Sequence, residues 1–77
     1  MIVNVYTPDF TRSFEADAIF LPGSVAPFEV LPGHAPIIST LEAGMLRWRT
    51  ASGEETLAIR SGAVRVAGDT IDICAEC

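Results

Sequence analysis

The stretch Met45-Leu46-Arg47-Trp48-Arg49-Thr50 decides the fold class of this chain. Along it the apolar Leu46 and Trp48 alternate with Arg47 and Arg49, and a period of two is the period of a β-strand. The alternation predicts that the tryptophan lies on the core face of the strand and that both arginines lie on the solvent face. On that face the arginines are placed to pair with carboxylates of a neighbouring strand.

Strand signals of the same kind recur on both sides of this stretch. The turn-forming run Ala51-Ser52-Gly53-Glu54 joins it to a second alternating segment, residues 56–60, and Ala67-Gly68-Asp69 predicts another turn near residue 68. The other predicted strands are residues 2–7, 10–14, 18–21, 28–31 and 37–41, the segment around Val64 and Val66, and residues 70–74. Strands at intervals of about eight to ten residues, without sustained helical periodicity, predict an all-β fold. We expect a small two-sheet β-sandwich of about ten short, mostly antiparallel strands.

Two Leu-Pro-Gly triplets mark corners in the first half of the chain, at Leu21-Pro22-Gly23 and at Leu31-Pro32-Gly33. Proline presets φ for the first corner of a type II turn, and glycine supplies the positive φ that the second corner requires. Each triplet is therefore predicted to end a strand and reverse the chain.

Length and composition set the limits on function. The chain has 77 residues, of which 49% are hydrophobic, and this predicts one small packed domain over residues 1–77. Its net charge of −5 argues against nucleic-acid binding, because contacts with phosphates need clustered cations. There is no basic leader, and no apolar run approaches the ~20 residues that cross a bilayer. We therefore predict neither a signal peptide nor direct insertion into a membrane.

Candidate catalytic or metal-binding residues are few. His34 is the only histidine, and without a nucleophile in a recognisable motif we interpret it as a turn residue whose imidazole bonds to backbone. The pair Cys74 and Cys77 has the Cys-x-x-Cys spacing, but two thiols and one histidine fall short of a structural zinc site. Glu54 and Glu55, at the tip of the expected hairpin, are interpreted as solvated charges rather than an acid–base couple. No catalytic residue, metal site or cofactor is predicted.

One segment resembles a known family. Residues 28–38, Phe-Glu-Val-Leu-Pro-Gly-His-Ala-Pro-Ile-Ile, are similar to the most distinctive stretch of the F-type ATP synthase epsilon subunit, which is called delta in mitochondria. Residues 41–47, Leu-Glu-Ala-Gly-Met-Leu-Arg, resemble a strand of that family, and weaker likenesses in the same order extend the resemblance along the whole chain. The resemblance implies the N-terminal β-sandwich domain of a non-catalytic central-stalk (rotor) subunit, which helps to couple proton flow to ATP synthesis.

The resemblance also implies partners, a location and contact residues. The direct partners are the gamma subunit and the c-subunit ring, and the catalytic head subunits belong to the same complex. The chain is expected as a peripheral component at the cytoplasmic face of the energy-transducing (plasma) membrane. The implied c-ring-contacting loop comprises Ser24, Val25, Ala26, Pro27, Phe28 and Glu29. The implied loop turn comprises Pro32, Gly33 and His34. The implied gamma-facing residues are Ile38, Thr40, Leu41, Met45 and Arg47.

The sequence departs from the family pattern in two places. Where the family carries a glutamate- and glycine-rich loop, this chain has Val-Ala-Pro-Phe-Glu at 25–29, so we expect the contact to use Phe28 and a displaced carboxylate. The sequence ends at Cys77, where many bacterial members of the family continue into a helical hairpin, and we accordingly expect neither nucleotide binding nor inhibition by a hairpin. Two other functions stay open: a stand-alone β-sandwich interaction module of another complex, and a small enzyme or metal protein that uses His34 and the cysteines.

Overall fold

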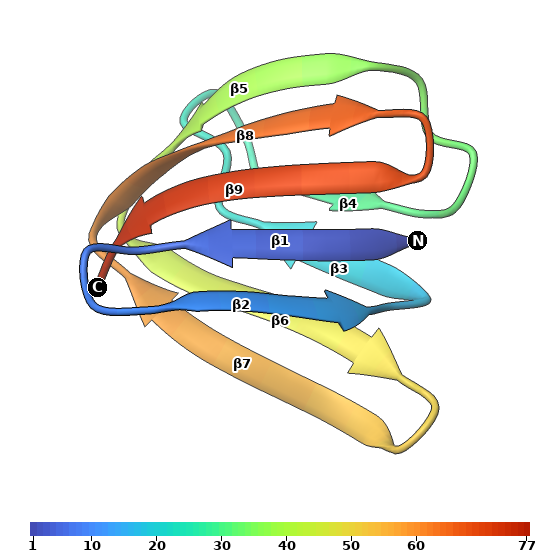
Figure 1. Ribbon diagram of the computed structural model, residues 1–77. Coiled ribbons are helices and arrows are strands. Elements are labelled where there is room, and N and C mark those ends of the chain that lie inside the picture. Colours follow the sequence, from blue (N-terminus) through green and yellow to red (C-terminus); the bar gives the residue numbers. More distant parts are fainter.

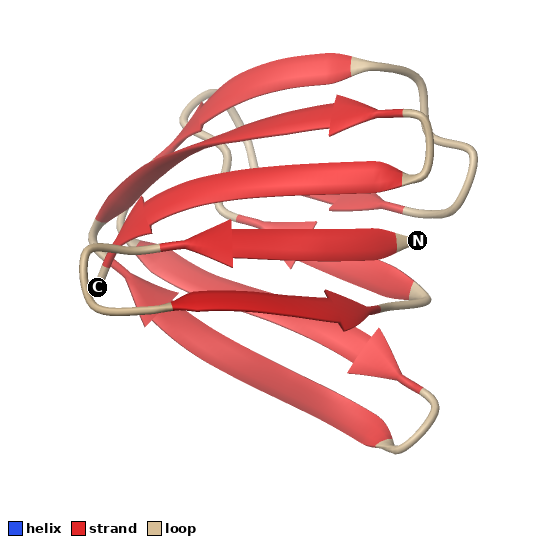
Figure 2. Cartoon of the chain, viewed as in Figure 1, coloured by secondary structure: helices blue, strands red, loops and turns tan.

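The computed structural model describes all of residues 1–77 as two β-sheets packed face to face, without helices (Figure 1, Figure 2). The five-stranded sheet has the order β2-β1-β9-β8-β5, and the four-stranded sheet has the order β4-β3-β6-β7. The strands are β1 (Ile2–Tyr6), β2 (Thr11–Glu15), β3 (Ala18–Leu21), β4 (Phe28–Val30), β5 (Ile37–Leu41), β6 (Gly44–Thr50), β7 (Gly53–Ile59), β8 (Ser61–Ala67) and β9 (Thr70–Glu76). The predicted all-β sandwich is confirmed, with nine strands. The chain has no helix with the length and hydrophobicity that crossing a membrane requires.

The first and last strands are neighbours in the middle of the five-stranded sheet. β1 and β9 pair in parallel, with Val3 opposite Ile71 and Val5 opposite Ile73, and Figure 1 shows them side by side. Every other strand pair is antiparallel. These four side chains face the other sheet and are fully buried, whereas the residues that alternate with them face outward.

One cluster of apolar side chains fills the space between the sheets, and the alternation along the strands accounts for it. On β6, Leu46 and Trp48 are buried, whereas Arg47 and Arg49 project from the outer face. This confirms the prediction made from the alternating stretch. No polar or charged residue is classed as buried, so the sandwich is held by hydrophobic burial and by its backbone hydrogen bonds.

Two tight hairpins connect neighbouring strands where the sequence predicts turns. Thr50 pairs with Gly53, which leaves a two-residue loop between β6 and β7. Ala67 pairs with Thr70 across the second loop, where Gly68 has a φ of +60°. Glycine at this first loop position is what a type II′ turn requires.

The second Leu-Pro-Gly triplet forms the predicted type II turn. Gly33 has a φ of +83°, and the amide of His34 donates to the carbonyl of Leu31 at 3.0 Å. Together these features define the corner that the proline and glycine were expected to make.

The same prediction was wrong for the first triplet, because Gly23 does not have a positive φ. Its amide donates to the carbonyl of Leu21 at 3.0 Å, and the residue forms an isolated bridge with Leu41. A Cβ placed on Gly23 would lie 2.5 Å from the carbonyl oxygen of Ala26 and 2.8 Å from the ring of Phe28. Close packing, rather than backbone conformation, therefore requires glycine here.

Candidate functional site

The loop after β3 closes one edge of the sandwich by bonding to the end of β5. The amide of Ser24 donates to the carbonyl of Thr40 at 3.0 Å, and the amide of Glu42 donates to the carbonyl of Pro22 at 2.9 Å. The hydroxyl of Thr40 also donates to Ser24 Oγ at 2.9 Å. A residue of the predicted c-ring loop is thus in direct contact with a residue of the predicted gamma-facing set.

Beside this loop, a groove of about 460 Å³ opens on the outer side of the four-stranded sheet. Its walls are mainly apolar, and a single cation and a single carboxylate complete them. The lining residues are Phe20, Leu21, Pro22, Pro27, Phe28, Glu29, Met45 and Arg47. The groove therefore brings three residues of the predicted c-ring loop together with two of the predicted gamma-facing residues.

Arg47 supplies the positive charge of the groove. Its Cζ lies 4.3 Å from the centre of the Phe20 ring, within the range of a cation–π contact. Its Nε lies 3.7 Å from Glu54 Oε1 on β7, which is too long for a hydrogen bond. The predicted pairing of an outer-face arginine with a neighbouring carboxylate is confirmed, but it leaves guanidinium N–H groups free for a further acceptor.

Apolar surface is exposed in the same groove. Met45 is 50% exposed and stands beside Arg47 on the outer face of β6, and Phe28 is half-buried. Val25, at the tip of the loop, is completely exposed. An arrangement of this kind can bind an apolar side chain and a carboxylate next to it, whereas it offers no nucleophile or proton relay.

The remaining predicted gamma-facing residues lie elsewhere. Ile38 is 80% exposed on the outer face of β5, in the five-stranded sheet, so it lies on the opposite side of the sandwich from Met45. Leu41 is 4% exposed because it alternates with Thr40 and points into the core. Its side chain is therefore closed to a partner in this structure.

His34 has the contact that the sequence predicted for it. Its Nδ1 lies 2.7 Å from the carbonyl oxygen of Ala35, to which an Nδ1–H donates. This hydrogen bond confirms that the imidazole bonds to backbone, and its role in fixing the turn stays a prediction.

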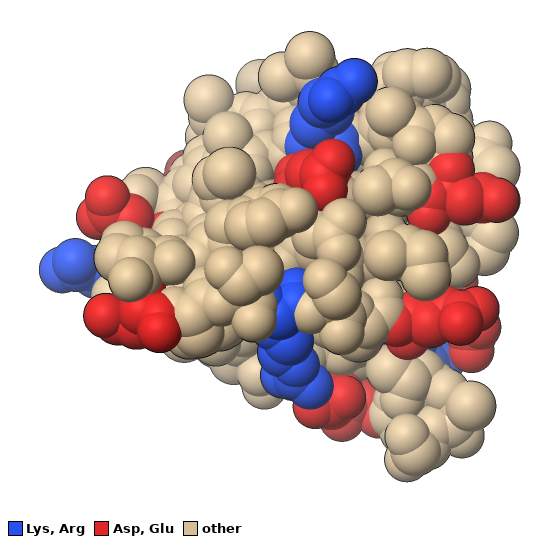
Figure 3. Space-filling model, in the orientation of Figure 1, with Lys and Arg blue, Asp and Glu red and all other residues tan.

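The titratable residues do not converge on a centre. No three His, Cys, Asp or Glu side chains lie together in a way that could hold a metal ion. Cys74, on β9, and Cys77, after its end, are both exposed free thiols. Glu54 and Glu55 are exposed, but they lie within β7 rather than at the hairpin tip, and each has an arginine partner. Figure 3 likewise shows basic and acidic side chains interspersed over the face of the five-stranded sheet.

Sequence reasoning missed Phe20 as a wall of the groove. Phe20 pairs with Arg47 across β3 and β6, and with Glu29 across β3 and β4. All four residues of the predicted strand 18–21 are apolar, so no alternation marks its outer face, and only the pairing of the strands reveals that Phe20 faces outward.

Comparison with known proteins points to one family. A family model described as the β-sandwich domain of the ATP synthase delta/epsilon chain matches residues 1–77. The chain is 42% identical over 64 residues to ATP synthase epsilon chain 2 of Syntrophotalea carbinolica, an alignment that covers 83% of this chain and 46% of that protein. It is 34% identical over 76 residues to the ATP synthase epsilon chain of Wolinella succinogenes, with coverages of 96% and 58%. The chain thus spans about half the length of these relatives.

Two solved structures have the same fold. One is a chain in the cryo-EM structure of the central stalk and c-ring of the Tetrahymena thermophila mitochondrial ATP synthase, with a TM-score of 0.84 and 19% identity, covering 100% of this chain and 63% of that one. The other comes from the OSCP, F1 and c-ring structure of the Euglena gracilis mitochondrial ATP synthase, with a TM-score of 0.89 and 22% identity, covering 97% and 49%. At these identities the likeness shows the fold.

Proposed function

We propose that this chain, which belongs to the family of the β-sandwich domain of ATP synthase delta and epsilon chains, is a non-catalytic part of the rotating central stalk. The family resemblance expected from residues 28–38 is confirmed. In the proposed role the chain binds the gamma subunit and the c-subunit ring of a proton-translocating F-type ATP synthase and turns with them. It is then a peripheral component at the cytoplasmic face of the energy-transducing membrane, in one complex with the catalytic head.

The observation that carries this proposal is the groove on the four-stranded sheet. Pro27, which precedes β4, and Phe28 and Glu29, which lie in β4 rather than in a loop, line it from the segment expected to meet the c-ring. Met45 and Arg47 line it from the surface expected to meet gamma. The groove thus joins part of each expected contact, although Ile38 lies on the opposite face and Leu41 is buried, and a shared surface suits a part that holds two neighbours in a fixed relation.

The chemistry of the groove defines what it would hold. An apolar side chain of a partner fits between Phe28 and the exposed part of Met45, and its burial supplies affinity. A carboxylate next to that side chain would accept hydrogen bonds from the guanidinium N–H groups of Arg47, which Glu54 is too distant to satisfy.

Rigidity of the contact surface supports the same role. The hydrogen bonds between Ser24 and Thr40 fix the loop before any partner arrives, and the type II turn at Gly33 fixes the next corner. A loop that is already ordered loses little conformational entropy on docking. A part that transmits torque needs such stiffness, and it needs no reactive group.

The test is binding of the gamma subunit from the same cell, measured by titration calorimetry. Met45→Asp places a charge in the groove, and we expect it to weaken gamma binding by about tenfold or more, as at a buried interface position. Ala51→Asp adds the same charge at an exposed position of the β6–β7 loop, and it should leave the affinity unchanged.

The outcomes separate the proposal from its alternatives. A folded wild-type chain without affinity for gamma contradicts the rotor role and favours an interaction module of another complex. Normal affinity in Met45→Asp rejects the groove as the gamma contact, while the rotor role itself stands. In the rotor role, His34→Ala keeps the fold and at most weakens coupling. An enzymatic activity that disappears in His34→Ala would instead favour the catalytic alternative.

A further inference from the structure

The two edges of the sandwich are closed in different ways. At the β5 edge, backbone hydrogen bonds join the sheets through Ser24 and Glu42. At the opposite edge β2 faces β7, and no backbone hydrogen bond joins these two strands. Figure 1 shows both strands together at the lower side of the molecule. The seam between β2 and β7 is therefore held by side chains alone.

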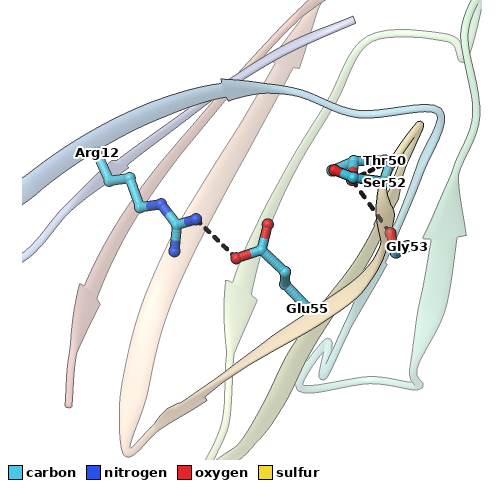
Figure 4. Close-up of polar contacts among 5 residues, drawn as sticks. All are labelled: Arg12, Thr50, Ser52, Gly53 and Glu55. Atoms are coloured by element: carbon cyan, nitrogen blue, oxygen red, sulfur yellow. Dashed lines mark hydrogen bonds and ion pairs between the residues drawn. The ribbon is translucent and has the colours of Figure 1, made fainter.

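One ion pair bridges this seam. Arg12 Nη2, on β2, donates to Glu55 Oε1, on β7, at 2.8 Å, as Figure 4 shows. Both side chains are about half exposed, at 47% each. An ion pair so open to water contributes little to stability, so it can break and form again readily.

An aromatic stack lies under the ion pair. The rings of Phe14, on β2, and Trp48, on β6, are stacked with their centres 4.5 Å apart and their planes at 21°. The Arg12 Cζ lies 5.4 Å from the centre of each ring. Arg12 thus covers the stack on the solvent side while it holds Glu55.

The indole N–H of Trp48 has no hydrogen-bond acceptor while β2 lies against β7. Its Nε1 is buried and has no hydrogen-bond partner, although Glu55 lies opposite Trp48 in the register of β6 and β7. The indole N–H adds to the lowering of the Glu55 pKa, which Arg12 mainly causes, but it does not reach hydrogen-bond geometry. A buried donor without an acceptor raises the free energy of the folded state. It therefore favours a state in which water reaches the donor and accepts its hydrogen bond.

The strand that carries Arg12 is otherwise held by its pairing with β1, which includes a hydrogen bond that the Ser13 hydroxyl donates to Asn4 Oδ1 at 2.7 Å. β2 is an edge strand bonded only to β1, and its residues are exposed apart from the half-buried Phe14. Release of β2 from β7 therefore removes little apolar burial beyond the Phe14–Trp48 stack. Regions with so few buried contacts open at a lower free energy than the core of the same domain.

We propose that the β2–β7 seam is a latch, in which Arg12 and Glu55 part and β2 leaves β7 and breaks its backbone hydrogen bonds to β1 while the other strands stay folded. Opening carries Phe14 off the indole, and water reaches Trp48 Nε1. The latch is a property of this sandwich alone and does not rest on the proposed function.

Amide hydrogen exchange and the fluorescence of Trp48, the only tryptophan, test the latch. In Arg12→Met and in Glu55→Gln, we expect exchange of the β2 amides to rise about two- to fivefold, the change that loss of an exposed ion pair produces. Quenching of Trp48 by acrylamide should rise in the same variants, while the amides of β8 keep their wild-type rates. The double variant should match the single ones, because either change already breaks the pair.

Arg47→Met is the matched control. It removes an arginine from the other ion pair to β7, whose partners are equally exposed at 48% and 49%, and it should leave β2 exchange and Trp48 quenching unchanged. A uniform rise over all strands in Arg12→Met and Glu55→Gln, or no change in β2, overturns the latch. If Arg12→Met fails to fold, Arg12→Lys keeps the charge without the planar fork. A wild-type β2 rate in both Arg12→Lys and Glu55→Gln then overturns the proposal.

Discussion

The hydroxyl of Thr40 donates a hydrogen bond to Ser24 Oγ at 2.9 Å, and so links β5 of one sheet to the loop that leaves β3 of the other. The same two residues are joined through their backbones, by the Ser24 amide and the Thr40 carbonyl. The position of the loop relative to β5 is therefore set within the chain. A partner that binds this loop therefore contacts a surface that is ordered before binding.

Thr40→Val tests how far the side-chain bond fixes the loop. The substitution keeps the shape of the side chain and removes its hydroxyl, so hydrogen exchange at Ser24 should rise. Because the bond is exposed, the free energy of unfolding should fall by less than about 1 kcal/mol in a urea titration. Thr56→Val, at an exposed position on β7, is the control and should change neither measurement. Unaltered exchange at Ser24 in Thr40→Val means that the backbone bonds alone hold the loop.

Gly23→Ala and Gly33→Ala should be destabilising for different reasons. At Gly23 the new methyl meets the Ala26 carbonyl and the Phe28 ring, and such overpacking costs about 1–3 kcal/mol. At Gly33 the space is open, and the cost comes from the φ of +83°, about 1–2 kcal/mol. Asparagine tolerates positive φ, so Gly33→Asn should be more stable to denaturation than Gly33→Ala. At position 23 asparagine is larger than alanine, so Gly23→Asn should be less stable than Gly23→Ala. The opposite order at position 23 contradicts the steric account.

The stability of the chain should depend on pH through Glu55. Arg12, by a hydrogen bond and by its charge, lowers the pKa of the Glu55 carboxyl from its ordinary value of 4.5, while partial desolvation opposes this. The folded state therefore binds the proton less tightly than the unfolded state does. The stabilising contribution is complete above the ordinary pKa and disappears as the pH falls through the lowered value.

Urea unfolding of the wild type and Glu55→Gln at a series of pH values measures this contribution. The difference in unfolding free energy should be constant near neutral pH and should shrink as the solution becomes acidic. In an Arg12→Met background the same comparison should show a much smaller dependence on pH. A difference that grows on acidification contradicts the assignment of the lowered pKa to the Arg12 contact.

The sequence predicted the positions of the strands better than it predicted which strands pair and which side chains are then in contact. The alternation of Leu46 and Trp48 with Arg47 reports which face each residue occupies, because burial of one face is a local property of a strand. The contact of Arg47 with Phe20 depends on which strands pair, and so does the ion pair from Arg12 to Glu55, whose partners are 43 residues apart. No local pattern contains that information. Gly23 shows the same limit, since its close packing against Phe28 comes from the path of the loop.

The parallel pairing of β1 with β9 also constrains when the protein can fold. The side-chain bond from Asn4 to Asp72 spans 68 positions, so the centre of the five-stranded sheet cannot assemble until the ribosome has released nearly all of residues 1–77. Pairings this distant in sequence form slowly, because the chain loses much entropy before any contact compensates. During synthesis, Val3 and Val5 therefore lack their partners in β9. Apolar side chains that stay exposed in this way can aggregate or bind a chaperone.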